Sequence, residues 1–170
     1  MITIHKETDS HRSIIRKINE SAFGKLEESN LIESLRTNGK IDISFVAKVN
    51  DQVVGHILFS PVFIENTECP KRGSALGPVA VLPEFQKKEV GSALINESLK
   101  QCKNIGIDYV ILLGHKTYYP RFGFKPLKNY GLTSTYGNGE HIMVHELTKG
   151  SLNFLSGKIC YQPEFQENKC

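Results

Sequence analysis

Apolar and polar positions along the first part of the chain follow two different periods, which predict a strand followed by a helix. Residues Ile2 to Ile4 alternate between apolar and polar, which is typical of a short strand. A helical period follows, with Asp9 or Ser10 placed to cap the helix and Gly24 placed to end it. The apolar stripe of this helix consists of Ile14, Ile15, Ile18 and Phe23.

The next segments predict a second helix and then a β-hairpin. The helix should run from Glu27 to Arg36, with Gly39 as its stop. Its apolar face consists of Leu31, Ile32 and Leu35. Two β-rich runs, Ile43–Val49 and Val53–Ile64, are separated by Asn50-Asp51-Gln52. Because Asn and Asp tolerate turn conformations, this separation predicts a hairpin.

A strand, a loop and a helix are predicted in the middle of the chain. The strand Ser74–Val81 is interrupted by Gly77-Pro78, and because proline removes a ladder donor, we expect the strand to be bulged or splayed there. A loop, Leu82–Glu89, leads into a helix from Val90 to Lys103. The buried face of that helix should contain Ala93, Leu94, Leu99 and Cys102.

The last third of the chain predicts three more strands and a packed tail. Tyr109–Leu113 is continuously apolar, as in a strand covered on both faces. A short helix at Tyr118–Phe122, closed by Gly123, precedes strands at Phe124–Leu127 and His141–Leu147. The segment from Gly150 to Phe165 contains Leu152, Phe154, Leu155, Ile159 and Tyr161 and is too apolar for a free linker. We therefore predict one domain, with a core at 1–148 and a tail at 149–170 that packs on it.

Composition and charge narrow the class of protein. The chain has 170 residues, 39% of them hydrophobic, with a net charge of +3, which excludes low-complexity disorder. No stretch approaches the ~18 apolar residues of a membrane span, and no run of Lys and Arg marks a nucleic-acid surface. The first residues lack the apolar core of a signal peptide, so we expect a cytoplasmic protein. The four cysteines form no CxxC pair, which predicts free thiols and no structural metal.

The segment with the most chemical information runs from Gly77 to Leu94, where a strand, a short loop and a helix follow one another. A helix start offers unpaired N–H groups and the positive end of the helix dipole, so it binds phosphate readily. Lys87 and Lys88 add positive charge there, and the next small residues let a phosphate approach the backbone. The alternative is an ordinary strand-to-helix connection with a solvated lysine pair. The fingerprints GxxxxGK[ST] and GxGxxG are both absent.

Two motifs in this order resemble the GCN5-related N-acetyltransferase (GNAT) family. That family carries V-x-V on a strand, about four residues, and then Q/R-x-x-G-x-G/A at the start of a helix. Here these stand as Val79-Ala80-Val81 and Gln86-Lys87-Lys88-Glu89-Val90-Gly91. The block Tyr118–Phe124 is similar to the family's Tyr-x-x-x-Gly-Phe block. Together with Gly114-His115 and the tail at Gly157–Phe165, it resembles the bacterial YhbS-like subgroup of the family.

The resemblance implies a fold and a cosubstrate. The fold is a mixed α/β (α+β) architecture with a mostly antiparallel central sheet, a splayed central strand and flanking helices. The cosubstrate is acetyl-coenzyme A (acetyl-CoA), with no metal. By resemblance, backbone groups of Val79 and Val81 pair with the pantetheine arm, and an N–H near Val81 stabilises the oxyanion. The residues implied to bind acetyl-CoA are Val79, Ala80, Val81, Gln86, Lys87, Lys88, Glu89, Val90, Gly91 and Ser92.

One residue departs from the family pattern, because Glu89 stands at the position of the first motif glycine. A carboxylate near the pyrophosphate would repel it, and a positive φ would be less favourable for Glu than for Gly. In the alternative, the side chain of Glu89 turns outward to water.

Candidate catalytic residues lie downstream. By resemblance, Tyr119 is the general acid that protonates the departing thiolate, a step that a neutral phenol can perform. Alternatively, Tyr119 is a packing aromatic. The base is not evident: His115 is a candidate because imidazole titrates near neutrality, and Glu65 and Glu68 are weaker candidates because both are expected in exposed loops.

These observations favour an N-acetyltransferase in which a primary amine attacks acetyl-CoA directly. The amine belongs to a small molecule or is an amino group of a protein. A non-catalytic acyl-CoA-binding module of the same fold is the second hypothesis, and an interaction domain that retained only the fold is the third. Neither nucleic acid nor a membrane is expected as a partner. The sequence indicates neither the acceptor nor the oligomeric state.

Overall fold

A computed structural model describes residues 1–65, 68–153 and 155–170 of the chain. The described residues form two compact units. Unit 1 comprises Met1–Ser60, Gly77–Lys100 and Pro163–Cys170, and unit 2 comprises Pro61–Leu76 and Gln101–Gln162. The predicted division into a core at 1–148 and a tail at 149–170 follows a different boundary and stays a prediction.

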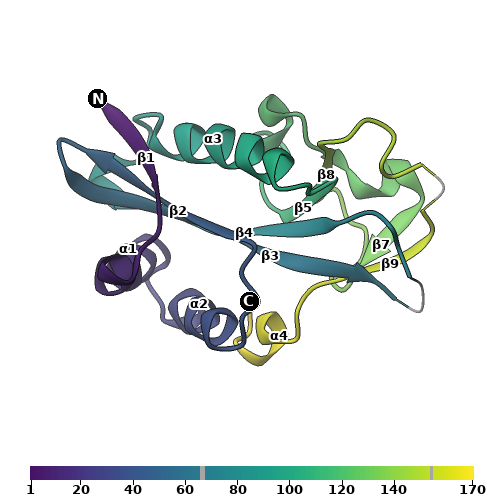
Figure 1. Cartoon of the computed structure of the whole chain (residues 1–170), viewed down its shortest axis with the longest axis horizontal. Coiled ribbons are helices and arrows are strands. Elements are labelled where there is room, and N and C mark those ends of the chain that lie inside the picture. Colours follow the sequence, from purple (N-terminus) through teal and green to yellow (C-terminus); the bar gives the residue numbers. More distant parts are fainter. Residues whose placement is uncertain (66–67, 154) are drawn as a thin grey trace. The chain divides into compact units, whose positions relative to one another are not determined.

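Unit 1 is an antiparallel sheet with helices. Its elements are β1 (Ile2–Lys6), α1 (Arg12–Phe23), α2 (Glu27–Thr37), β2 (Ile43–Val49), most of β3 (Gln52–Ile64), the second half of β4 (Gly73–Val81), most of α3 (Val90–Asn104) and α4 (Glu164–Glu167). Strand β2 pairs antiparallel with both β1 and β3. Figure 1 shows α1 and α2 on one face of these strands and α3 on the other. The sheet of unit 1 is therefore covered on both faces.

The predicted hairpin is confirmed in unit 1. Val49 pairs with Gln52, which leaves Asn50 and Asp51 as a two-residue turn with φ of 47° and 65°. Both values lie in the left-handed region, which Asn and Asp adopt more easily than most residues. On the α3 face, a Cβ atom at Gly55 would meet side-chain atoms of Val90 and Leu94 at 3.1 and 3.0 Å. The small residue at 55 thus lets α3 approach β3 closely.

Unit 2 is a second set of paired strands. Its elements are the end of β3, the start of β4, β5 (Tyr109–Leu113), β6 (Lys125–Pro126), β7 (Leu132–Ser134), β8 (Ile142–Glu146) and β9 (Gly157–Cys160). Strand β8 pairs antiparallel with β5 and β6, and β9 pairs antiparallel with β3 and parallel with β7. The parallel pairing of β4 with β5 covers Gly73 to Ala75, ahead of Gly77-Pro78, and β4 itself continues through these two residues to Val81. The predicted mixed, mostly antiparallel fold is confirmed.

Several predicted details need correction. Phe23 is 39% exposed and does not belong to the buried stripe, because it is the last residue of α1. Asp9 and Ser10 do not cap α1 but lie in a 3₁₀ turn, Asp9–His11, that precedes it. Ala93 is half-buried, while its neighbour Ile95 is fully buried.

The tail contributes to both units. In unit 2, Ile159 and Tyr161 are buried, and β9 pairs with the end of β3. In unit 1, the carboxylate of Glu164 is 3% exposed, accepts a hydrogen bond from Asn38 (2.7 Å) and forms an ion pair with Lys40 (3.0 Å). Phe154, which the sequence predicted to pack with this tail, lies outside the described residues.

Candidate functional site

The second half of β4 carries the V-x-V residues in unit 1. Ala80 is buried, whereas Val79 and Val81 are half-buried and, by the alternation of a strand, share the opposite face. The strand end is fixed to β3, since the N–H of Leu82 donates to the carbonyl oxygen of Val54 at 2.9 Å. The side-chain amide of Gln86 donates to the carbonyl oxygen of Val81 at 3.0 Å. This bond holds the following loop against the end of β4.

The loop between β4 and α3 contains two non-glycine residues in the left-handed region. The φ angles are 57° at Lys87 and 62° at Glu89. For L-residues this conformation costs about 1–2 kcal/mol relative to the right-handed one. The backbone that glycine favours is therefore present at the first motif position, although Glu89 occupies it. Gln86, Lys87, Lys88 and Glu89 are all exposed.

The start of α3 follows directly. The carbonyl oxygen of Glu89 accepts the N–H of Ala93 at 2.9 Å, which closes the first turn of the helix. Val90 is buried and anchors this turn, while Gly91 and Ser92 are half-buried. The N–H groups of a first helical turn have no acceptor within the helix, and the helix dipole is positive there. With Lys87 and Lys88 beside it, this end of α3 suits an anion such as a diphosphate.

Tyr119 lies in unit 2, in the 3₁₀ turn Tyr119–Phe122 that Gly123 closes. The residue is 8% exposed, and its ring makes edge-on contacts with Tyr118 and Phe124, at centroid distances of 5.1 and 5.8 Å. Burial, with a smaller contribution from Tyr118, raises the pKa of the Tyr119 phenol to about 12. The phenol is thus protonated at neutral pH. A neutral phenol keeps its O–H as a hydrogen-bond donor.

The candidate bases are also in unit 2. His115 is exposed, and its carbonyl oxygen accepts the N–H of Tyr118 at 3.0 Å. Glu65 is exposed, as predicted, and forms an ion pair with Lys158 at 2.9 Å, and Glu68 is exposed as well. The predicted residues therefore fall into two groups, with the implied acetyl-CoA-binding residues in unit 1 and Tyr119 and His115 in unit 2.

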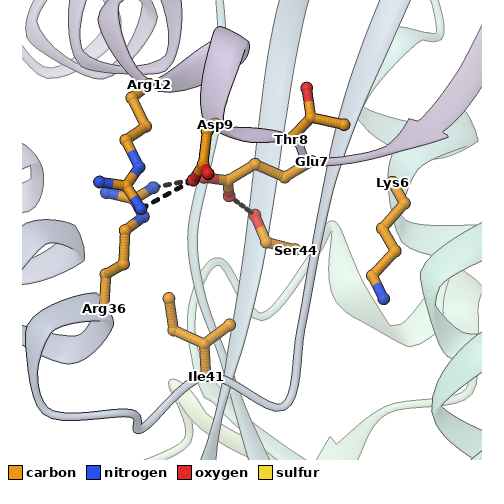
Figure 2. Close-up of a pocket in the computed structure, with 8 residues that line it drawn as sticks. All are labelled: Lys6, Glu7, Thr8, Asp9, Arg12, Arg36, Ile41 and Ser44. Atoms are coloured by element: carbon orange, nitrogen blue, oxygen red, sulfur yellow. Dashed lines mark hydrogen bonds and ion pairs between the residues drawn. The ribbon is translucent and has the colours of Figure 1, made fainter.

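A pocket of about 460 Å³ in unit 1 contains none of the predicted catalytic or acetyl-CoA-binding residues. Figure 2 shows its lining, which consists of Lys6, Glu7, Thr8, Asp9, Arg12, Arg36, Ile41 and Ser44. Glu7 and Arg36 form an ion pair of 2.5 Å, and Arg12 and Asp9 form another of 2.8 Å. The charges of these four side chains are thereby compensated within the protein.

A chain of hydrogen bonds leads from this pocket into the core of unit 1. Ser44 donates to Glu7, and its hydroxyl lies 2.9 Å from Nε2 of His56, which is fully buried. On the other side of the ring, the amide of Asn19 lies 3.2 Å from Nδ1 of His56. With the Nε2–H tautomer, each step has one donor and one acceptor. This network is not evident from the sequence, because its four members come from four separate segments of the chain.

Comparison with known proteins identifies the family. The model of the GNAT acetyltransferase family matches residues 9–124 of the chain. The chain therefore belongs to this family, and the prediction of an N-acetyltransferase enzyme is confirmed at that level.

Individual relatives agree with this assignment. The uncharacterized N-acetyltransferase YjhQ of Escherichia coli K12 is 36% identical over 126 residues, which are 73% of this chain and 70% of YjhQ. The GNAT protein YhbS of Escherichia coli, solved in complex with CoA, has a TM-score of 0.91 and 26% identity, over 97% of this chain and 92% of YhbS. A GNAT acetyltransferase of Brucella melitensis in complex with acetyl-CoA has a TM-score of 0.81 and 32% identity, over 97% and 98% of the two chains.

No helix among the described residues is long and apolar enough to cross a membrane. In the same part of the chain, no group of three His, Cys, Asp or Glu side chains is arranged to hold a metal ion.

Proposed function

We propose that this enzyme transfers the acetyl group of acetyl-CoA to a primary amine by direct attack, without an acetyl-enzyme intermediate. The observation that carries the proposal is the loop Gln86–Glu89 at the start of α3, with its glycine-like backbone at the first motif position. Two relatives that match 97% of the chain were solved with CoA or acetyl-CoA, which supports the same ligand here.

The residues of unit 1 fit this ligand. The first turn of α3 and the two adjacent lysines provide the donors and the positive charge that a diphosphate needs. Val79 and Val81 are half-buried residues of β4. The extended backbone at these residues is the part with which the family's motif holds a pantetheine arm. Gln86 keeps the loop in place through its bond to the carbonyl oxygen of Val81. Glu89 is the one unfavourable charge in this set.

In the proposed reaction, the acetyl group forms a new C–N bond and its bond to sulfur breaks. An N–H near Val81 stabilises the oxyanion that develops on the carbonyl oxygen. Tyr119 donates its phenolic proton to the departing sulfur, and the amine gives up a proton to a base. His115 is the proposed base, because its exposed imidazole can exchange that proton with water. Tyr119 regains its proton from solvent because its pKa of about 12 favours the neutral phenol.

The substitution Tyr119→Phe tests this proposal. The ring and its contacts with Tyr118 and Phe124 are kept, so the dissociation constant for acetyl-CoA should stay within twofold. The value of kcat should fall about 10²-fold, the lower end of general acid–base contributions. Tyr118→Phe is the matched control and should keep most of the activity. Thiol release with a panel of amines and calorimetry with acetyl-CoA provide the two measurements.

Two results would contradict parts of the proposal. Equal kcat in the wild type and in Tyr119→Phe would exclude Tyr119 as the general acid. Binding of acetyl-CoA without transfer to any amine of a broad panel would favour the non-catalytic binding module.

A further inference from the structure

Gly114 lies between the end of β5 and the turn that carries Tyr119, in unit 2. Its N–H donates to the carbonyl oxygen of His141 at 2.9 Å, which continues the pairing of β5 with β8 by one residue. The backbone at Gly114 is therefore fixed by the sheet and cannot move away easily from a neighbour.

The ring of Tyr119 occupies the space in which a side chain at residue 114 would begin. A Cβ atom on Gly114 would lie 2.2 Å from Cε2 and 2.6 Å from Cδ2 of Tyr119. Non-bonded carbon atoms prefer a separation of about 3.5–4.0 Å. Even one methyl group at this position therefore has to displace the ring by roughly 1 Å or more.

The other contacts of Tyr119 restrict where its ring can go. The backbone is held by the N–H of Tyr119, which donates to the carbonyl oxygen of His115 at 3.4 Å. The rings of Tyr118, Phe122 and Phe124 lie at centroid distances of 5.1, 6.4 and 5.8 Å from the ring of Tyr119. These rings and the held backbone surround Tyr119, so a methyl group at Gly114 would push its ring against aromatic neighbours.

We propose that Gly114 is a positioning residue that sets where the phenol of Tyr119 lies during proton transfer, a role that rests on the proposed function of Tyr119. The absence of a side chain lets the ring lie directly against the end of β5. Because a misplacement of about 1 Å can cost on the order of 10²-fold in rate, the effect of a methyl group should appear in turnover. Binding of acetyl-CoA does not depend on the phenol position and should be preserved.

Gly73 provides a matched control in the same unit. A Cβ atom on Gly73 would lie 2.3 Å from Cζ of Tyr109, a buried tyrosine on β5. Gly73→Ala therefore introduces the same methyl group under a different buried tyrosine ring. Any general loss of stability is shared by the two variants, whereas an effect on Tyr119 is specific to Gly114→Ala.

The experiment combines kinetics with NMR of the protein labelled with ¹³Cζ-tyrosine. The resonance of Tyr119 is assigned as the one that Tyr119→Phe removes. Gly114→Ala should shift this resonance and lower the phenol pKa below about 12, because the displaced ring gains solvent. It should also lower kcat at least tenfold, with KM for acetyl-CoA within twofold. Gly73→Ala should leave both the resonance of Tyr119 and kcat unchanged.

A double variant separates positioning from general packing. If Gly114 acts through Tyr119, adding Gly114→Ala to Tyr119→Phe should lower kcat no further, because the phenol is already gone. An unshifted Tyr119 resonance in folded Gly114→Ala, or losses in kcat that multiply in the double variant, would overturn the proposal. A shifted resonance with unchanged kcat would overturn the role of the ring position in turnover. If Tyr119→Phe is itself fully active, the proposed general acid fails, while the resonance still reports whether Gly114 places the ring.

Where Gly114→Ala alone does not fold, it is combined with Tyr119→Ala. The smaller side chain at 119 removes the atoms that the new methyl group would meet. Recovery of folding in the pair supports the contact, and a pair that stays unfolded while Tyr119→Ala alone folds overturns it.

Discussion

The buried ion pair of Glu7 and Arg36 should make unit 1 sensitive to acid. The two side chains are 10% and 13% exposed. Burial by itself would raise the pKa of Glu7. The nearby imidazole of His56, with Nε2 at 3.7 Å, the hydrogen bonds from Ser44 and Arg36 and the charge of Arg36 outweigh that effect and lower the pKa from 4.5 to about 2. Relative to its protonated form, the carboxylate of Glu7 is therefore more stable in the folded chain than in the unfolded one.

The size of this contribution follows from the two pKa values. A pKa of about 2 in the folded state against 4.5 in the unfolded state corresponds to about 3 kcal/mol of stability at neutral pH. Because the folded-state pKa is the lower one, this stability is fully present above pH 4.5 and is lost as the pH falls toward 2. At pH 3.5, about 1.4 kcal/mol of it should already be gone.

The substitution Glu7→Gln tests this reasoning, because it keeps the shape of the side chain and removes its charge. Arg36 retains its bond to Glu33, so we expect a loss of about 2–4 kcal/mol at pH 7, near the lower range for breaking a buried pair. Urea unfolding followed by circular dichroism at pH 7 and pH 3.5 gives the free energies of unfolding. The difference between wild type and Glu7→Gln should be about 1.4 kcal/mol smaller at pH 3.5.

A second substitution on the same guanidinium serves as the control. Glu33 also bonds Arg36, but its side chain is 44% exposed, so Glu33→Gln should cost less than about 1 kcal/mol. A cost of less than about 1 kcal/mol for Glu7→Gln at pH 7, or an equal cost at both pH values, would contradict the predicted role of this ion pair.

Three other predictions concern the loop before α3, the first turn of α3 and the tail. Gly91→Asp should weaken acetyl-CoA binding at least tenfold in calorimetry, about 1.4 kcal/mol, and unchanged affinity in the folded variant would exclude the start of α3 from the site. Glu89→Gly should tighten binding. Glu89→Gln, which keeps the backbone conformation and removes the charge, should tighten it equally if repulsion is the cause, and a looser complex in either variant would contradict that cause. Glu164→Ala should lower the free energy of unfolding by about 1–3 kcal/mol, because Asn38 and Lys40 lose their partner, and a change below about 0.5 kcal/mol would mean that α4 contributes little.

Local signals in the sequence predicted much of the fold. Strands β2 and β5 have the predicted bounds, and Asn50-Asp51 forms the predicted turn, because each depends on residues adjacent in sequence. Strands β7 and β9 were not predicted. With three and four residues, they are too short to show an alternation of apolar and polar positions. Strand β7 exists because it pairs with β9, which lies more than twenty residues further along the chain.

Contacts between distant residues account for what the sequence could not indicate about the site. Glu7, Arg36, Ser44 and His56 are unremarkable where each occurs in the sequence, and their network follows only from strand register and helix packing. The crowding between Gly114 and Tyr119 is of the same kind, because it depends on how the chain turns after β5. The acetyl-CoA-binding motif, in contrast, could be predicted from the sequence, since its residues lie in one continuous segment.

The loop before α3 explains how a glutamate can occupy a position at which the family carries glycine. Lys87 and Glu89 both adopt the left-handed region, which has a conformational free-energy cost for residues with a side chain. Such a conformation persists only where the surrounding structure holds it. Contacts on either side hold this conformation. Before the loop, the N–H of Leu82 donates to Val54 of β3 and the side chain of Gln86 donates to Val81, and after it the carbonyl oxygen of Glu89 closes the first turn of α3. Because these contacts determine the backbone, glycine is not needed to reach it. The remaining consequence of Glu89 is its charge, and so we infer that any difference in cofactor affinity from a glycine-containing loop is mainly electrostatic.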